Sequence, residues 1–256
     1  MNNPVKISSI IIAKNEERNI RRCIESQLRC IDNIVVLVDK SSADKTLDIV
    51  KNFEGIVWEE FEWMGYSASK QYALSKTKYD WVFWIDADEV LTSELIDELI
   101  ERKQRGFDKD SYSVARRAYF LNRWIKHSGW YPGRVVRLFN KNKARFSEHD
   151  VHEHLVIDGN TGELKNDLEH YTDPNIFHYF EKFNKYTTLA ANELGGKKRS
   201  VGVFDLIVRP GFLFFKMYIL KRGFLDGFQG FILAVFSSLY VFTKYSKLWE
   251  INKNIK

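Results

Sequence analysis

Short apolar runs and amphipathic segments alternate along the first hundred residues. The apolar runs at 7–13, 33–38, 56–60 and 81–85 are rich in β-branched or aromatic residues and predict strands. The segments at 16–29, 44–53, 67–76 and 93–104 place apolar residues at helical spacing and predict helices, the last capped by Thr92. Such alternation predicts an α/β fold built on a doubly wound, mostly parallel sheet.

The rhythm changes after about residue 110. Strands are predicted at 112–119 and 135–139, and the next helix is predicted at 175–194. A Gly-Gly-Lys-Lys-Arg-Ser stretch at 195–200 predicts a linker. We therefore expect a body of residues 1–196, with halves 1–110 and 111–196, followed by a tail of residues 197–256.

The tail differs from the body in charge. The chain has 256 residues and a formal net charge of +5, and its 45% of hydrophobic residues exclude a disordered or fibrous class. Residues 197–256 hold 11 Lys/Arg and 3 Asp/Glu, a net charge of +8, against −3 for residues 1–196. The two cysteines, Cys23 and Cys30, exclude a disulfide scaffold, and the start of the sequence does not resemble a signal peptide. We expect a cytoplasmic protein.

The basic tail is also rich in aromatic and aliphatic residues. Apolar residues between 212 and 220 surround Lys216, and Lys221 and Arg222 follow them. An apolar face edged with lysine and arginine favours helices that lie in the interface of an anionic membrane. Two alternatives stay open: packing of these helices on the body, and a transmembrane span through the 17 uncharged residues 227–243. Nucleic-acid binding is not expected, because bulky aliphatic residues separate the basic ones.

Three carboxylates follow directly after the predicted strand at 81–85. Doubly wound sheets bind ligands at the carboxyl ends of their strands, which directs attention to Asp86-Ala87-Asp88-Glu89. Like charges repel unless a cation lies among them, and Mg²⁺ or Mn²⁺ prefers carboxylates together with phosphate oxygens. The cluster indicates either a metal site or a solvated turn before a helix, where acids suit the helix dipole.

Two other strand ends carry candidate ligand-binding residues. Asp39 ends the second predicted strand and is placed to bind a base or ribose, whereas Asp44 is expected to cap the next helix. Ala13-Lys14-Asn15-Glu16 follows the first strand. The sequence contains no GxGxxG and no GxxxxGK[ST], which argues against a glycine-loop dinucleotide site and against P-loop phosphoryl transfer.

The segment His149-Asp150-Val151-His152-Glu153-His154 offers a base or metal ligands. In a strand, His152 and His154 would share one face, which leaves a zinc pair open, although no HExxH helix is present. Glu153 is either a general base or a surface glutamate. Arg134 and Arg137 either hold phosphates or lie on the exposed face of a strand.

Together these features resemble family 2 glycosyltransferases of the GT-A fold and, more narrowly, bacterial lipopolysaccharide-core β-1,4-glucosyltransferases. The motifs that carry the resemblance are AKNEERNI (13–20), VLVD (36–39), SADKT (42–46), WVFWIDADE (81–89), NRWI (122–125), GWYP (129–132), RLF (137–139), VHE (151–153), KYTT (185–188), FLDG (224–227) and KLWE (247–250). Lys40, and Ser69-Lys70-Gln71 in place of Gln-Lys-Asn, depart from the family pattern.

The resemblance implies an inverting transfer of a hexose, with glucose expected, from a nucleotide diphosphate sugar such as UDP-glucose. It assigns Asp39 to the nucleobase, and Asp86 and Asp88 to Mg²⁺ or Mn²⁺ and the diphosphate. It also assigns to Glu153 the removal of the proton from the acceptor hydroxyl. The implied donor pocket consists of Ala13, Asn15, Glu16, Asp39, Lys70, Asp86, Ala87, Asp88, Arg134 and Arg137.

The implied acceptor is a lipopolysaccharide-core or other glycolipid, which the tail would meet at the inner face of the bacterial inner membrane. A metal-dependent nucleotidyltransferase is the alternative enzyme, although the glycine-rich basic loop expected near its start does not occur here. A catalytically inert carbohydrate- or membrane-binding protein of the same fold is the alternative outside enzymes.

Overall fold

The computed structural model of the chain describes residues 3–147 and 155–253. It divides into two compact units, the first made of residues 1–116 with 134–170 and the second of residues 117–133 with 171–256. This division follows packing and differs from the expected functional boundary at residue 196, which stays a prediction.

The first unit begins with the predicted alternation of strands and helices. All four predicted strands and all four predicted helices are present, with ends that differ by a few residues. Thr92 caps the fourth helix, because its Oγ1 accepts a hydrogen bond from the Leu95 N–H at 3.2 Å. In chain order these elements are β1 (Ile7–Ala13), α1 (Ile20–Gln27), β2 (Asn33–Asp39), α2 (Thr46–Lys51), β3 (Val57–Phe61), α3 (Tyr66–Ser75), β4 (Trp81–Trp84), β5 (Glu89–Leu91) and α4 (Ser93–Arg105).

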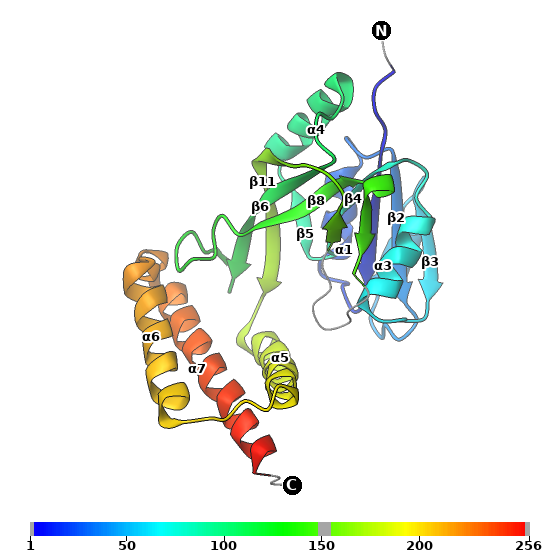
Figure 1. Cartoon of the computed structure of the whole chain (residues 1–256). Helices are drawn as coiled ribbons and strands as arrows, with labels where there is room; N and C mark the ends of the chain where they lie inside the picture. The colour runs from blue at the N-terminus through cyan, green and yellow to red at the C-terminus, as the bar shows by residue number, and fades with distance from the viewer. Residues whose placement is uncertain (1–2, 148–154, 254–256) are drawn as a thin grey trace. The chain divides into compact units, whose positions relative to one another are not determined.

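The main sheet is mixed, with strand order β3-β2-β1-β4-β8-β6-β11-β5 (Figure 1). Strands β3, β2, β1 and β4 pair in parallel, as predicted. The remaining half differs from the prediction, because β8 pairs antiparallel with both β4 and β6 and β11 pairs antiparallel with β5. Its strands, with the short hairpin β9–β10 beside it, are β6 (Ser111–Phe120), β8 (Arg134–Asn140), β9 (Ala144–Phe146), β10 (Leu155–Ile157) and β11 (Thr161–Asp173).

Alternation along the central strand places apolar side chains on both faces of the parallel half. Ile7 and Ile11 of β1 pack in one core with α1, α2 and α4, whereas Ile10 packs in a second core with α3 and the hairpin β9–β10. Each core excludes water from one face of the sheet, which gives the doubly wound arrangement its hydrophobic stabilisation.

The longest strand, β11, was not predicted from the sequence. Its sequence, TGELKNDLEHYTD, is largely polar and lacks the apolar alternation that identifies a strand. Leu164 and Leu168 are nonetheless buried in the core. Pairing with β6 and β5 explains why this polar segment is extended, and local propensity does not.

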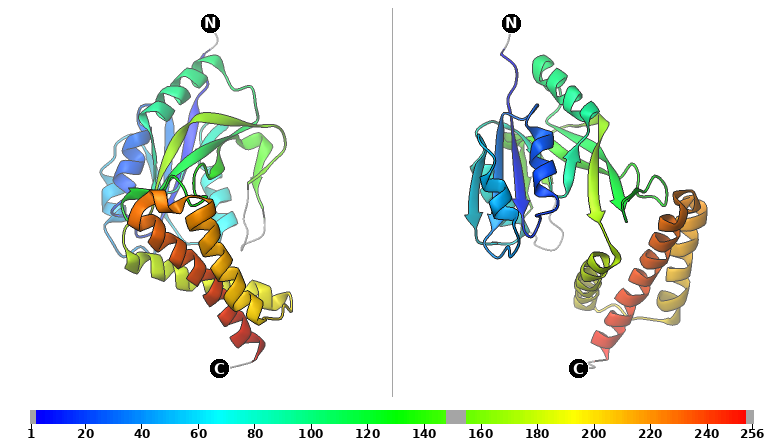
Figure 2. Two further views of the ribbon diagram at one scale, coloured as in Figure 1. Left: turned by 90° about the vertical axis from the view of Figure 1, so that its left-hand side faces the viewer. Right: turned by 180° about the vertical axis from the view of Figure 1, so that it is seen from behind.

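The second unit is mainly helical. Helices α5 and α6 both pack on α7, as Figure 2 shows. The predicted helix at 175–194 is present as α5, but it continues through Gly196, into the stretch predicted as a linker. Its elements include β7 (Arg123–Trp124), α5 (Ile176–Gly196), the π-helical turn η2 (Phe204–Val208), α6 (Arg209–Phe215), the π-helical turn η3 (Lys216–Leu220), the 3-10 turn η4 (Gly223–Asp226) and α7 (Gly227–Asn252).

Two of the C-terminal motifs hold this unit together. In α7, the Lys247 Nζ lies 2.9 Å from the Thr187 Oγ1 and 2.7 Å from the Thr188 Oγ1 of α5. Thr187 and Thr188 belong to the KYTT motif and Lys247 to the KLWE motif, so these two motifs meet in the fold. Among the described residues, one helical segment, 223–252, has the length and composition of a membrane span.

Asp226, from the FLDG motif, clamps the loop at residues 126–128. Its buried carboxylate accepts hydrogen bonds from the Lys126 N–H at 3.1 Å and the His127 N–H at 3.0 Å, and it also lies 2.9 Å from the His127 Nδ1. The first turn of α7 lies close to this region. A Cβ on Gly230 would lie 2.1 Å from the Gly223 carbonyl oxygen, so only glycine fits at position 230.

We predict that Asp226→Ala destabilises the second unit by about 2–4 kcal/mol, because two backbone donors and an imidazole lose a buried charged acceptor. Urea unfolding followed by tryptophan fluorescence measures the loss. Asp48→Ala, at an exposed position in α2, serves as the control and should change stability by less than about 0.5 kcal/mol. Equal midpoints for the two variants would contradict the clamp.

Candidate active site

Three loops meet where the parallel strands end. Because β1 lies between β2 and β4, the segments after these strands, 14–16, 40–45 and 86–88, emerge at the same edge of the sheet. They contain most of the residues predicted for the donor pocket.

The first two loops are locked to each other. Asn15 has a positive φ of 56°, and its side-chain Oδ1 accepts a hydrogen bond from the Ala43 N–H at 2.8 Å. The Glu16 N–H donates to the Thr46 Oγ1 at 2.7 Å. Asp44 accepts from the Thr46 N–H at 3.0 Å, but the N-cap residue of α2 is Lys45, which makes no side-chain capping bond, so the predicted cap by Asp44 is wrong by one residue. Asn15 and Glu16 therefore fix the loop beside Asp39.

Asp39 is a buried carboxylate that accepts hydrogen bonds through only one of its two oxygens among the described residues. Its Oδ1 accepts from the Ser41 N–H at 2.8 Å and the Ser41 hydroxyl at 2.7 Å. Its buried Oδ2 has no hydrogen-bond partner within the described ranges 3–147 and 155–253, although the Lys14 Nζ lies 3.4 Å away. Burial opposes ionisation, but the bonds from Ser41 outweigh it and hold the pKa of Asp39 below its usual range.

Asp86 and Glu89 share one guanidinium. The Nη2 of buried Arg137, from β8, contacts the Asp86 Oδ2 and lies 2.6 Å from the Glu89 Oε1. The other oxygen of Glu89 accepts a hydrogen bond from the Asp86 N–H at 3.0 Å. Arg116 lies 3.8 Å from the same Glu89. The carboxylates are thus neutralised in part by the protein itself, a possibility that the sequence analysis did not consider.

The pKa values of Asp86 and Glu89 are shifted in opposite directions. Burial opposes ionisation of Asp86, but the charges of Arg137 and Lys70 outweigh it and lower the pKa of this group. Burial is also the largest influence on Glu89, where it prevails over Arg137 and raises the pKa. The two side chains also differ in exposure, because Asp86 is 41% exposed while Glu89 is completely buried. Asp86 is accessible to a ligand and Glu89 is a buried support.

Trp84 forms the apolar wall of this cluster. The Lys70 Nζ lies 3.7 Å from the centre of the indole ring, and the Arg137 Cζ lies 4.5 Å from it. Phe146 packs edge-on against Trp84, with centroids 5.2 Å apart. The cationic side chains of Lys70 and Arg137 are therefore positioned by one aromatic ring.

Asp88 contacts a histidine from the strand that the sequence analysis missed. Its Oδ2 lies 3.4 Å from the His170 Nε2, and His170 stands opposite Glu89 in the β11–β5 pairing. Within the described ranges, no three His, Cys, Asp or Glu side chains converge as a complete metal site. Two carboxylates, Asp86 and Asp88, nonetheless suit Mg²⁺ or Mn²⁺, which bind few protein carboxylates and complete their shell with phosphate oxygens and water.

The remaining predicted residues have different surroundings. Ala13 and Ala87 are buried in the core. Arg134 lies 3.3 Å from Glu163 and donates to the Leu164 carbonyl at 3.2 Å, so its guanidinium is tied to β11. Arg137 faces Asp86 and Glu89.

Glu153 and the neighbouring histidines, His149, His152 and His154, lie outside the described residues, so the structure does not test the base or the zinc alternative. His170 and Arg116 were missed by the sequence analysis. A histidine in a polar segment and an arginine within a strand carry no local signal, and only sheet pairing brings them to the acidic cluster.

Comparisons with known proteins agree with this arrangement. The family model for glycosyl transferase family 2 matches residues 8–172. The chain is 31% identical over 250 residues to the lipopolysaccharide core biosynthesis glycosyltransferase LpsC of Rhizobium meliloti, covering 95% of this chain and 92% of that protein. It is 32% identical over 263 residues to an uncharacterized glycosyltransferase of Rickettsia typhi, covering 96% and 88%.

A solved structure has a similar fold. The mannosyltransferase PcManGT of Pyrobaculum calidifontis, in complex with GDP-Man and Mn²⁺, aligns with a TM-score of 0.56 and 11% identity. The alignment covers 96% of this chain and 88% of that one. At this identity the likeness concerns the fold.

We predict that Arg137→Gln destabilises the protein by about 3–5 kcal/mol, because it leaves the buried Glu89 without its counter-ion. Urea unfolding measures the change. The double variant Arg137→Gln/Glu89→Gln should lose less than the sum of the single variants, since Glu89 is then no longer a buried charge without its counter-ion. Arg116→Gln, which removes the longer contact to Glu89, is the matched control and should cost about 1 kcal/mol or less. Additive losses would contradict the ion cluster.

Proposed function

Because the chain belongs to glycosyl transferase family 2, we propose that it transfers a hexose, with glucose expected, from a nucleotide diphosphate sugar to a lipopolysaccharide-core or other glycolipid acceptor. The expected GT-A-like α/β fold is present. The full-length similarity to LpsC, which is described as a lipopolysaccharide core biosynthesis enzyme, supports the acceptor class.

The donor site is the edge of the sheet where β1, β2 and β4 end. The observation that carries this assignment is the buried Oδ2 of Asp39, which forms an ion pair with Lys14 at 3.4 Å but makes no hydrogen bond among the described residues. A buried carboxylate oxygen without a hydrogen bond is costly, and a ring N–H of uracil or guanine would supply one. The interlocked loops of Asn15 and Glu16 hold this acceptor in place before a nucleotide binds.

Asp86 and Asp88 would hold a divalent cation together with the donor diphosphate. When bound, Mg²⁺ or Mn²⁺ supplies positive charge against the negative charge that grows on the departing nucleotide diphosphate. Arg137 and Glu89 orient Asp86 from the buried side. Lys70, held against Trp84, adds a cation close to the same carboxylate.

Glu153 is proposed as the general base, on the resemblance alone. Its carboxylate would accept the proton of the acceptor hydroxyl while that oxygen attacks the anomeric carbon and the bond to the diphosphate breaks. A single displacement of this kind inverts the configuration of the sugar and requires no enzyme nucleophile.

The second unit is proposed to hold the enzyme on an anionic membrane. Along the helical segment 203–220, exposed apolar side chains recur every three or four residues and form one stripe: Phe204, Val208, Phe212, Phe215 and Ile219. Lysine and arginine residues flank this stripe, and residues 197–256 carry a net charge of +8. Aromatic insertion combined with a basic rim supports binding in the interface of an anionic leaflet, where a glycolipid acceptor lies.

We predict that the purified chain, with Mg²⁺ or Mn²⁺, releases nucleoside diphosphate from one member of a panel of UDP-, GDP- and ADP-sugars. Glu153→Gln should lower turnover about 10²–10⁴-fold, because it removes the base. Asp88→Asn should lower it at least about 10²-fold, because it removes a proposed ligand of the cation. Liquid chromatography of the released nucleotide measures both effects.

Glu54→Gln and Asp48→Asn are the matched controls, because both side chains are exposed, and they should retain full turnover. Loss in Asp88→Asn alone would leave the base unassigned. Absence of turnover together with absence of donor binding by calorimetry would refute the transferase and favour the inert binding protein.

We predict that the chain sediments with vesicles containing phosphatidylglycerol and that added salt weakens binding. Phe212→Ser/Phe215→Ser should weaken binding about tenfold or more, because two aromatic side chains lose their burial in the interface. Val57→Ser, an exposed apolar residue of the first unit, is the control and should bind normally. A chain that stays in the supernatant at low salt would refute membrane attachment.

A further inference from the structure

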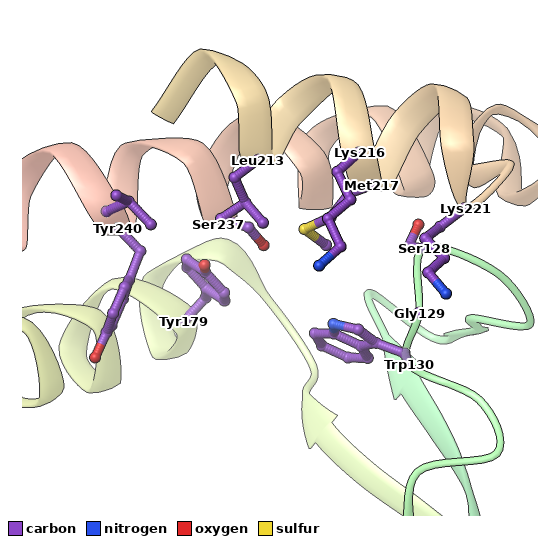
Figure 3. Close-up of a pocket in the computed structure, with 11 residues that line it drawn as sticks. Ser128, Gly129, Trp130, Tyr179, Leu213, Lys216, Met217, Lys221, Ser237 and Tyr240 are labelled. Atoms are coloured by element: carbon purple, nitrogen blue, oxygen red, sulfur yellow. The ribbon is translucent and has the colours of Figure 1, made fainter. Parts of the chain in front are cut away.

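The helical unit contains an open cavity that the donor site does not use. Its volume is about 450 Å³, which lies in the range of small-molecule sites. It opens between the loop at 128–130, the end of α6 with η3, and the facing sides of α5 and α7 (Figure 3). All of its lining residues belong to the second unit.

The charged groups that line this cavity are both cationic. Lys216 and Lys221 line it, and no aspartate or glutamate does. In the described part of the chain neither lysine has an ion-pair partner. The π-helical turn η3 brings them together, because its i→i+5 geometry closes a 2.8 Å hydrogen bond from the Lys221 N–H to the Lys216 carbonyl. Two uncompensated ammonium groups on one wall favour an anion.

A buried hydroxyl lies at the same wall. Ser128 is 4% exposed, and its Oγ has no hydrogen-bond partner in the described residues. The Ser128 N–H donates to the Lys221 carbonyl at 2.9 Å, which ties this residue to the end of η3. Asp226 fixes the preceding residue, His127, as described above. The Oγ packs against Gly223, where an added Cβ would lie 2.5 Å from it, so the loop at 128–130 is held rigidly at the wall that carries the two lysines.

Aromatic rings form the remainder of the cavity. Trp130 and Tyr179 line it and both pack edge-to-face on buried Phe120, with centroids 6.2 Å and 5.7 Å apart. This packing fixes their orientation before a ligand binds. Rigid aromatic rings beside cations and a hydroxyl suit a sugar ring that carries a negative charge, since its C–H faces pack on the rings while its anionic group and hydroxyls meet the polar wall.

We propose that this cavity binds a phosphate-bearing sugar of the glycolipid acceptor. This proposal rests on the proposed function for one point, that the sugar belongs to the glycolipid acceptor. The groups that would recognise a phosphate-bearing sugar are Lys216, Lys221 and Trp130. The site lies directly under the helical segment whose other side carries the exposed apolar stripe, so a lipid-anchored sugar reaches it from the membrane interface.

The test follows the indole N–H signals of the full-length protein by NMR. The chain has seven tryptophans, and Trp130→Phe identifies the signal of Trp130 by its loss. Glucose 1-phosphate is the probe, with glucose, inorganic phosphate and glycerol 3-phosphate as comparisons for the sugar, the anion and a phospholipid head group. We expect glucose 1-phosphate to shift the Trp130 signal at a lower concentration than any of the other three.

Charge variants locate the ligand. Lys216→Gln/Lys221→Gln should weaken the binding of glucose 1-phosphate about tenfold or more, with the other indole signals unchanged. Lys253→Gln, an exposed lysine at the end of α7, is the matched control and should leave binding unchanged. No shift of Trp130, or an undiminished shift in the double lysine variant, would overturn the proposal.

Equal binding of inorganic phosphate or glycerol 3-phosphate would overturn it as well, because the sugar would then contribute nothing. The titration needs no donor and no turnover. A failure here therefore leaves the transferase proposal standing. UDP, added to the same sample, tests the donor site separately through the signal of Trp84, which packs against Lys70 and Arg137.

Discussion

The buried guanidinium of Arg137 connects the two halves of the sheet. It comes from β8, the strand where the pairing changes from parallel to antiparallel, and it binds Asp86 and Glu89 on either side of the turn after β4. A buried cation is stable only with its carboxylates, and Glu89 only with a cation. The position of Asp86 at the edge of the sheet therefore depends on a strand fifty residues further along the chain.

This pairing changes how the acidic cluster is understood. Three neighbouring carboxylates suggest a bound cation, yet Arg137, Arg116 and His170 already contact all three of them. A divalent cation would join a site that is balanced in part beforehand. Partial exposure leaves Asp86 able to meet a ligand, whereas Glu89 serves the fold. Support from the buried side is what keeps such a carboxylate in one orientation.

The second unit solves a different physical problem. Its helices pack on one another and also present a large apolar surface, and a charged side chain buried among them needs a polar partner. Lys247 has such partners in the threonines of α5, and Asp226 has one in His127. Lys216 and Lys221 are exposed at the border of a cavity, and neither has an acidic partner in the described chain.

The sequence by itself determined the parallel half of the fold and the loops at its edge, because short apolar strands and amphipathic helices are encoded locally. It also identified Asp39, Asp86 and Asp88 as residues that follow strands. Strand β11, the antiparallel pairing of β8, and the contacts of Arg137 and His170 were decided only by tertiary structure. The acidic partners of Arg137 and His170 lie 48 to 82 residues away in the sequence. Neither a polar strand nor a buried ion pair produces a periodic pattern of apolar residues from which it could be predicted.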